Sequence, residues 1–305
     1  MADTPYRIGR NLTGLSRARA FAVVTLAYVA AAVAGGVVVR ALDGRHPITA
    51  YFWADIVATV VVFAFSMAVA NSSLYDPYWS VAPPLILVGW LIGHGTFSTR
   101  QAIVLVLVTV WAVRLTANWA TGWSGLGQED WRYVQIREQT RGRLPWWLVS
   151  FIGIQLVPTL VVFAGMLSAW PVVVGQRPLN ALDLVALLVT VVAIALETLA
   201  DLQLRRFAAD GANRGRTVDI GLWRLSRHPN YLGEIGLWWG LWLFGLAAAP
   251  NWWWTIVGPL VMVALFVGVS VPLMEKRSLE RRADYAVYQR NVRMLLPVRK
   301  TLKSS

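Results

Sequence analysis

The densest set of side chains that could do chemistry lies in residues 217–240, in the last third of the chain. Arg224, Arg227 and His228 stand just before Pro229, a residue that often occupies the first position of a helix. Cationic side chains and unpaired backbone N–H groups at a helix N-terminus bind phosphate well. This arrangement predicts a site for a phosphate-bearing cofactor.

The helix predicted to begin there carries further polar groups on one face. Asn230 and Glu234 are four residues apart, and Gly233 allows another group to approach the helix closely. An amide and a carboxylate in this arrangement suit an amide or hydroxyl group held against the helix. The segment as a whole therefore indicates a phosphorylated cofactor with a polar ring.

Several ionisable residues lie within apolar runs, where a charge at mid-bilayer costs at least about 2.5–3.5 kcal/mol. Arg114 is deep in its run, either as a structural cation or as one that faces a buried anionic ligand. Glu197, Asp201 and Arg205 are spaced four apart and share one helix face. Either Asp201 and Arg205 form a local ion pair, or the three residues line a polar cavity at the cytoplasmic end of the helix bundle. Asp55 is near a run end, where water is expected.

The composition of the chain determines which elements must position these groups. Of its 305 residues, 57% are hydrophobic and only 14% are charged, whereas soluble domains carry about 25% charged residues. The chain has no cysteine, which excludes a disulfide, a thiol nucleophile and a zinc–thiolate site. These values predict an integral, multi-pass membrane protein with an all-α fold.

The apolar runs give the number of membrane spans. About 20 apolar residues cross a bilayer, and the third run is short and interrupted by proline, so the sequence predicts a bundle of seven or eight spans. The eight runs lie near residues 19–40, 51–71, 78–97, 101–120, 146–167, 181–201, 233–250 and 253–273.

The distribution of positive charge favours eight spans. Lysine and arginine concentrate on the cytoplasmic side of membrane proteins. With the N-terminus inside, an eight-span arrangement places 23 of the 28 Lys and Arg residues in cytoplasmic segments. We therefore expect both termini to be cytoplasmic. Because the basic residues lie in loops between spans, the net charge of +12 indicates contact with anionic membrane lipids, and we expect no nucleic-acid partner.

No flexible linker divides the chain. We expect a single membrane domain over residues 1–305. The long polar segments 121–145 and 202–232, together with the tail after Met274, are predicted to form a cytoplasmic cap. The chemistry-bearing residues would then gather beneath this cap.

The string Arg227-His228-Pro229-Asn230-Tyr231-Leu232-Gly233-Glu234 resembles the signature of the steroid 5α-reductase C-terminal domain family, in particular its bacterial branch. The resemblance extends to the helix that carries Glu197 and Asp201 and reaches Arg205. It covers residues 75–297, and residues 1–50 add an extra N-terminal span. It implies a protein of the bacterial inner membrane.

This resemblance implies that the protein uses NADPH to reduce a carbon–carbon double bond conjugated to a carbonyl. The substrate would be a lipophilic, steroid-like or isoprenoid enone that enters from the bilayer. Asp76 matches the acid beside the substrate carbonyl. The resemblance and the segment 217–240 together indicate the cofactor-binding residues. These are Arg114, Glu197, Asp201, Arg205, Arg224, Arg227, His228, Asn230, Tyr231 and Glu234.

The sequence departs from the family pattern at the proton donor. Trp111 stands where the family has a catalytic tyrosine, and an indole cannot donate a phenolic proton. Tyr75 and Tyr78 beside Asp76 are alternative donors, and Tyr75 is taken with Asp76 as the catalytic pair. The tail also departs from the family, whose cofactor-contacting Arg, His and Tyr do not align cleanly with residues 275–280. Arg277, Arg281 or Tyr285 would substitute for them.

Two other functions fit parts of the sequence. Isoprenylcysteine and phospholipid methyltransferases share an Arg-His-Pro-x-Tyr-x-Gly string and a basic tail, but they bind S-adenosylmethionine. Asn230 and Glu234 resemble the reductase branch more closely. A non-enzymatic transporter or lipid-binding protein would also have broken helices and buried charges, but it would give no reason for the cluster at residues 227–234.

Overall fold

The apolar runs form long helices. The computed structural model describes residues 14–95 and 97–296, and no strand occurs among them. Six helices are long and apolar enough to cross a membrane, which confirms the predicted class, a polytopic helical bundle. They are α2 (Arg17–Ala41), α3 (Pro47–Ala68), α5 (Thr99–Gly122), the continuous helix Trp146–Val174, α10 (Ala181–Ala209) and the continuous helix Pro250–Arg281.

The two other predicted runs are also helical but meet the criteria for a span less well. The helix α4 (Tyr78–His94) has 17 residues, with Pro83 and Pro84 inside it. At 1.5 Å per residue it is about 26 Å long, short of the roughly 30 Å hydrocarbon core. The helix α11 (Pro229–Ala248) has 20 residues, but its first turns carry polar groups. The count of six therefore falls below the predicted seven or eight.

The direction of insertion stays a prediction. Arg7, Arg10 and the basic residues after position 296 contribute to the charge count, and they lie outside the described residues. The cytoplasmic position of both termini thus depends on the charge distribution alone.

The helices divide into two compact units, residues 1–173 and 174–305. In the first unit, α2 and α3 pack along a stripe of small side chains. The buried residues of α2 include Ala20, Ala27, Ala31 and Gly35, spaced at helical intervals. A Cβ atom on Gly35 would lie 3.3 Å from the carbonyl oxygen of Ala54. Small residues allow such close approach where no hydrophobic effect drives helices together in lipid.

The rest of the first unit follows α3 as short and long helices joined by brief turns. A 3₁₀ turn (Ser72–Leu74) leads into α4, and α6 (Trp131–Thr140) follows α5 outside the candidate spans. The continuous helix Trp146–Val174 contains α7 (Trp146–Val149), a π-helical segment (Ser150–Leu156), α8 (Val157–Met166), a 3₁₀ turn and α9 (Trp170–Val174). The polar turns at 71–78 and the helix α6 position the first candidate site.

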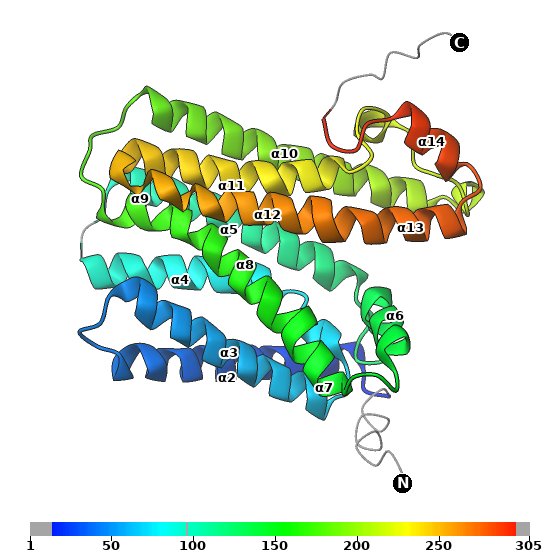
Figure 1. The fold of residues 1–305 in the computed structure, drawn as a ribbon, viewed down its shortest axis with the longest axis horizontal. Helices are drawn as coiled ribbons and strands as arrows, with labels where there is room; N and C mark the ends of the chain where they lie inside the picture. The colour runs from blue at the N-terminus through cyan, green and yellow to red at the C-terminus, as the bar shows by residue number, and fades with distance from the viewer. Residues whose placement is uncertain (1–13, 96, 297–305) are drawn as a thin grey trace. The chain divides into compact units, whose positions relative to one another are not determined.

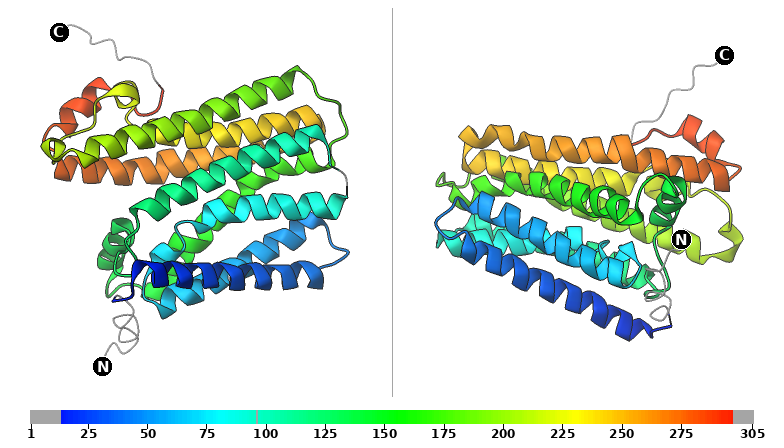
Figure 2. Two further views of the ribbon diagram at one scale, coloured as in Figure 1. Left: turned by 180° about the vertical axis from the view of Figure 1, so that it is seen from behind. Right: turned by 60° about the horizontal axis from the view of Figure 1, so that its bottom comes forward.

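In the second unit, α10 and α11 run side by side (Figures 1 and 2). A Cβ atom on Gly233 would lie 2.7 Å from the carbonyl oxygen of Ala193, and one on Gly240 would lie 2.1 Å from Oγ1 of Thr190. The glycines thus permit this contact. The final long helix contains a 3₁₀ segment (Pro250–Ile256), α12 (Val257–Leu265), a π-helical segment (Phe266–Ser270) and α13 (Val271–Arg281), and α14 (Tyr285–Asn291) follows.

The polar end of the second unit is built by the loop before α11 and by α14. The backbone N–H and hydroxyl of Thr217 both donate to the carboxylate of Asp284, at 2.9 and 2.5 Å. In Figure 1, α14 and this loop lie at the end of α13 and α10 where those helices leave their apolar runs. The fold therefore brings the loop before α11 and the tail after α13 together.

Candidate functional site

The string at residues 227–234 begins α11 and is held by the tail. Pro229 occupies the first turn of the helix, and His228 precedes it. The backbone N–H groups of Arg227 and His228 donate to the carbonyls of Arg293 and Met294, at 2.9 and 3.2 Å. This pairing fixes the start of α11 against the segment that follows α14.

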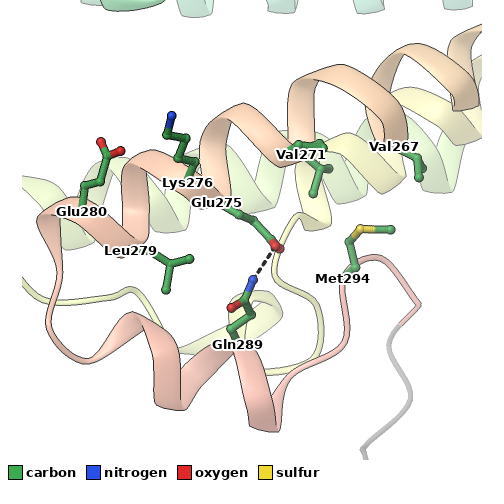
Figure 3. A pocket seen from close by; sticks show the side chains of 9 residues that line it. Val267, Val271, Glu275, Lys276, Leu279, Glu280, Gln289 and Met294 are labelled. Carbon is green, nitrogen blue, oxygen red and sulfur yellow. Dashed lines mark hydrogen bonds between the residues drawn. The ribbon is translucent and has the colours of Figure 1, made fainter.

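Glu275 in α13 joins the motif to the tail. Its Oε1 accepts from Nε of Arg227 at 2.6 Å and lies 3.2 Å from Nε2 of His228. Its Oε2 accepts from the amide of Gln289 at 2.6 Å, a bond drawn in Figure 3. Arg227 also donates through Nη1 to the carbonyls of Gln289 and Val292. Arg227 and His228 therefore have partners that hold them rigidly.

The sequence did not single out Glu275. It lies directly after the last apolar run, where an acid is close to water and gives little signal. Its partner Arg227 lies 48 residues earlier in the chain. The basic residues before α11 were the only signal for it in the sequence, because a cation that becomes buried needs an acidic partner.

A cavity of about 160 Å³ opens beside the motif. Its lining includes four arginines and several aromatic rings, which suit a phosphorylated ligand with a flat ring. The volume is below the roughly 300 Å³ at which ligand pockets begin, so the cavity can hold only part of a larger ligand. The lining residues are Leu204, Thr217, Val218, Trp223, Arg227, His228, Asn230, Tyr231, Met274, Arg277, Ser278, Arg281, Arg282, Tyr285 and Tyr288.

The structure brings four predicted cofactor residues to this cavity: Arg227, His228, Asn230 and Tyr231. The ring of Tyr231 stacks on that of His228 with an interplanar angle of 6°. The amide of Asn230 donates to Oδ1 of Asp201 at 3.4 Å, so this acid of α10 lies directly behind the motif. The motif and the α10 acid thus share one site.

The two predicted glutamates lie deeper. Glu234 is buried and accepts from the indole N–H of Trp238 at 3.0 Å. Glu197 is buried next to Gly233, since a Cβ atom on this glycine would be 2.8 Å from that of Glu197. Glu197 therefore belongs to the contact between α10 and α11, and Glu234 is buried against its own helix.

Three predicted cofactor residues lie elsewhere. Arg205 and Arg224 are exposed and are not among the residues that line the cavity, and Arg224 donates to the carbonyl of Asp219 at 3.4 Å. Arg114 belongs to the first unit, where it is half-buried in α5.

The tail positions that the sequence left open are now placed. Arg277, Arg281 and Tyr285 all line the cavity, and so does Arg282. Burial, with a smaller contribution from the negative charge of Glu275, raises the pKa of Tyr285 to about 12. Tyr285 therefore remains a neutral hydrogen-bond donor at physiological pH.

A second cavity lies beside α13 and contains Glu275 and Gln289 in its lining (Figure 3). It measures about 560 Å³, and apolar residues form much of its wall. Val271 and Leu279 come from α13, and Met294 comes from the segment after α14 (Figure 3). α13 thus contributes residues to both of these cavities.

In the first unit, Asp76 follows the 3₁₀ turn that precedes α4. The side chain of Asn71 caps this turn by accepting from the N–H of Ser73 at 2.8 Å. Oδ1 of Asp76 accepts from the hydroxyl of Tyr133, in α6, at 2.5 Å. Arg132 beside it pairs with Asp130 through two bonds of 2.9 and 3.0 Å.

The surroundings of Asp76 favour its protonated form. Burial raises the pKa of Asp76 to about 7, although the charge of Arg132 and the bond from Tyr133 pull it down. Burial and the charge of Asp76 raise the pKa of Tyr133 well above its ordinary value, so its hydroxyl keeps its proton. A carboxyl that titrates near neutrality can hold and release a proton in a reaction.

The tyrosines predicted as alternative donors are bonded to other groups. The hydroxyl of Tyr75 lies 2.8 Å from Oγ1 of Thr159, and that of Tyr78 donates to Oδ1 of Asp55 at 2.6 Å. Asp55 was expected near water, but it is only 5% exposed. Trp111 is fully buried and meets the ring of Trp79 edge-on.

Tyr133 is the phenol that contacts Asp76, and the sequence did not single it out. It lies in a polar segment that was assigned only to a cap. Its type and its distance of 57 residues from Asp76 gave no indication of the contact.

These features define a polytopic helical membrane protein with a basic, aromatic cavity at a polar end. The chain belongs to the family described as "Protein of unknown function (DUF1295)", which matches residues 62–292. This is a steroid 5α-reductase-like family, which confirms the predicted resemblance at the level of the family.

One curated relative comes from the fission yeast Schizosaccharomyces pombe, where it is described as an uncharacterized protein. It is 31% identical over 265 residues, which cover 78% of this chain and 76% of the yeast protein. No solved structure gives a significant match. Because the relative is eukaryotic, a bacterial inner-membrane location stays a prediction.

Proposed function

We propose that this protein is a membrane-embedded reductase that uses NADPH to reduce a carbon–carbon double bond conjugated to a carbonyl in a lipophilic molecule. The observation that carries this proposal is the cavity of the second unit, where Asn230 and Tyr231 of the motif stand beside four arginines. Membership of a steroid 5α-reductase-like family supports the same chemistry.

The donor set of the cavity fits a phosphorylated dinucleotide. Arg277, Arg281 and Arg282 supply guanidinium groups on one side, and Tyr285 and Tyr288 supply ring faces. Planar guanidinium groups bind phosphate through paired hydrogen bonds, and they stack on aromatic rings. When bound, the reduced nicotinamide of such a cofactor supplies a hydride.

Within the cavity, the residues of the motif would orient the ligand. Glu275 holds Arg227 and His228 in place, so these two side chains form a rigid wall. Asn230 lines the cavity, and its amide is held by the bond that it donates to Oδ1 of Asp201. A preorganised wall of this kind avoids the cost of ordering side chains on binding.

Asp76 would supply the proton. Reduction of a conjugated double bond at its β-carbon places negative charge on the carbonyl oxygen, and a hydrogen-bond donor at that oxygen stabilises the transition state. Protonated Asp76 is such a donor, and its pKa near 7 means that a large part of the population carries the proton at neutral pH. The hydroxyl of Tyr133 donates to Oδ1 of Asp76 and so holds the carboxyl in position.

The cofactor assignment can be tested by thermal unfolding of the detergent-purified protein with NADPH, NADH or S-adenosylmethionine. We expect the largest rise in midpoint temperature with NADPH. Stabilisation by S-adenosylmethionine alone would favour the methyltransferase, and no stabilisation by any of the three would favour a non-enzymatic protein.

A charge reversal then locates the binding site. Arg281→Glu removes an exposed cation from the lining of the cavity and is expected to weaken NADPH binding about tenfold, equivalent to about 1.4 kcal/mol. Arg290→Glu is the matched control, because Arg290 is exposed on α14 but does not line the cavity. Equal losses of NADPH affinity in both variants would show that binding depends on the overall positive charge at the polar end of the second unit, and not on Arg281 in the cavity.

A further inference from the structure

The cavity beside α13 has no part in the proposed reaction. It measures about 560 Å³, within the range of about 300–1,000 Å³ that is typical of small-molecule sites. It is open to the outside of the molecule, so a ligand can reach it without passing through the helix bundle. The residues that line it all belong to the second unit. The cavity therefore offers both room and a route.

The cavity lies where its helix leaves the apolar region. The continuous helix Pro250–Arg281 has 32 residues, which makes it about 48 Å long, whereas the hydrocarbon core is about 30 Å thick. The apolar run within it ends at residue 273. Three lining residues precede this point, and four on the same helix follow it. They are Val267, Val271 and Pro272 before it, and Glu275, Lys276, Leu279 and Glu280 after it. The cavity thus extends from the depth of the acyl chains into the headgroup layer.

The part of the cavity on the membrane side has an apolar wall. Val267 and Val271 are four residues apart along the helix, and Met294 lies opposite them in the segment after α14 (Figure 3). Because this part lies at the depth of the bilayer, the molecules that reach its open side are lipids. An acyl chain is the group that such a wall fits.

The other part of the cavity carries two charged side chains. Lys276 and Glu280 are four residues apart on α13 and exposed, and neither forms an ion pair within the part of the chain that the structure describes. Figure 3 shows both pointing away from Gln289. Glu275 differs from them, because its two oxygens are bonded to Arg227 and to Gln289. One cation and one anion are therefore left for a ligand.

The charges identify the class of headgroup. A phosphate accepts hydrogen bonds from an ammonium group, and a primary ammonium donates them to a carboxylate. A headgroup that carries both, as in phosphatidylethanolamine, can pair with Lys276 and with Glu280. An anionic headgroup such as phosphatidylglycerol would bring its negative charge close to Glu280. Diacylglycerol has no charge and would pair with neither.

We propose that this cavity binds one molecule of phosphatidylethanolamine at the membrane surface. One acyl chain lies against Val267 and Val271, the phosphate pairs with Lys276 and the amine pairs with Glu280. The bound lipid also covers Glu275, which holds Arg227 of the motif, so it stabilises the polar end of the second unit. The site goes beyond the proposed reduction and does not rest on it.

Three lipids with the same chains test this site. Thermal unfolding of the detergent-purified protein is measured with dioleoyl phosphatidylethanolamine, dioleoyl phosphatidylglycerol or dioleoylglycerol at equal mole fractions in the micelle. We expect phosphatidylethanolamine to raise the midpoint temperature by about 2 °C or more over each of the others. Equal rises with the three lipids would overturn the proposal.

Charge-reversal variants assign the effect to the two side chains. Lys276→Glu should lose the advantage of phosphatidylethanolamine over diacylglycerol. Glu280→Lys makes the edge of the cavity doubly cationic, and it should reverse the preference toward phosphatidylglycerol. Asp219→Lys is the matched control, because it makes the same change at an exposed position that does not line the cavity, and it should keep the wild-type preference.

Two results with these variants would overturn the proposal. One is a preference for phosphatidylethanolamine that persists in Glu280→Lys, and the other is a reversal in Asp219→Lys equal to that in Glu280→Lys. NADPH is absent from these measurements, so they are separate from the test of the proposed function. A protein that binds NADPH but does not distinguish the three lipids would overturn this inference alone.

Discussion

The hydroxyl of Tyr133 donates to Oδ1 of Asp76 across 2.5 Å, although 57 residues separate the two in the chain. Asp76 lies in a turn between helices, and Tyr133 lies in α6, outside the candidate spans. The contact thus ties a polar turn to a helix that the hydropathy pattern assigns only to a cap. It places a phenol beside the carboxyl that is proposed to supply a proton.

Removing the carboxyl should stop the reaction and leave cofactor binding intact. Asp76→Asn is expected to lower turnover of a lipophilic enone by about 10²–10⁴-fold, because an amide cannot transfer a proton in this way. The NADPH-dependent rise in midpoint temperature should not change. An unaltered turnover rate would remove Asp76 from the mechanism.

Tyr133→Phe should change the pH profile more than the maximal rate. The bond from Tyr133 lowers the pKa of Asp76, so its loss should raise that pKa above its value of about 7. The rate requires protonated Asp76 and falls as the pH rises, and this fall should therefore move to higher pH in the variant. A profile that does not move would show that Tyr133 has no influence on the reacting proton.

The stability of the protein should depend on pH through Asp76. The pKa of Asp76 rises from 3.8 to about 7 on folding, so the folded protein binds this proton more tightly than the unfolded chain. Its stabilising contribution is fully present below about pH 4 and is lost as the pH rises through about 7. The midpoint temperature of the wild type should therefore fall, relative to Asp76→Asn, between pH 5 and pH 8.

The control for this dependence is Asp219→Asn, which changes an exposed aspartate in the second unit. Its midpoint temperature should follow that of the wild type at every pH. A wild-type profile parallel to that of Asp76→Asn would contradict the prediction.

Glu275 is expected to matter for stability more than any exposed acid on its helix. Glu275→Gln would leave Arg227, whose side chain is 9% exposed, without its carboxylate. The cost is expected to be about 2–3 kcal/mol, because an uncompensated buried charge remains. Thermal unfolding of Glu275→Gln against Glu280→Gln measures it, since Glu280 is exposed on the same helix. Equal midpoints in the two variants would be the contrary result.

The contact between α10 and α11 should tolerate no side chain at Gly233. A Cβ atom there would lie 2.7 Å from the carbonyl oxygen of Ala193 and 2.9 Å from the backbone nitrogen of Glu197, and backbone atoms cannot move aside easily. Gly233→Ala is expected to cost about 1–3 kcal/mol. Gly268→Ala is the control, because nothing lies within 4 Å of its Cβ position, and it should be neutral or stabilising.

The sequence alone determined the class of the fold and the location of the motif. Apolar runs of about 20 residues must form helices in lipid, because every backbone group has to be satisfied within its own segment. All eight predicted runs are helical for this reason, including α4 and α11. The string at 227–234 was recognisable because its residues are contiguous, and Pro229 suits the first turn of a helix, which it occupies in α11.

Only the tertiary structure decided which groups meet. Glu275 binds Arg227 across 48 residues, Tyr133 binds Asp76 across 57, and Thr159 contacts Tyr75 across 84. Such partners depend on how helices pack, and hydropathy carries no information about rotation around a helix axis within an apolar run. The same reason explains why Asp55 was expected near water and is buried against Tyr78. Local patterns determined each helix, and packing determined the site.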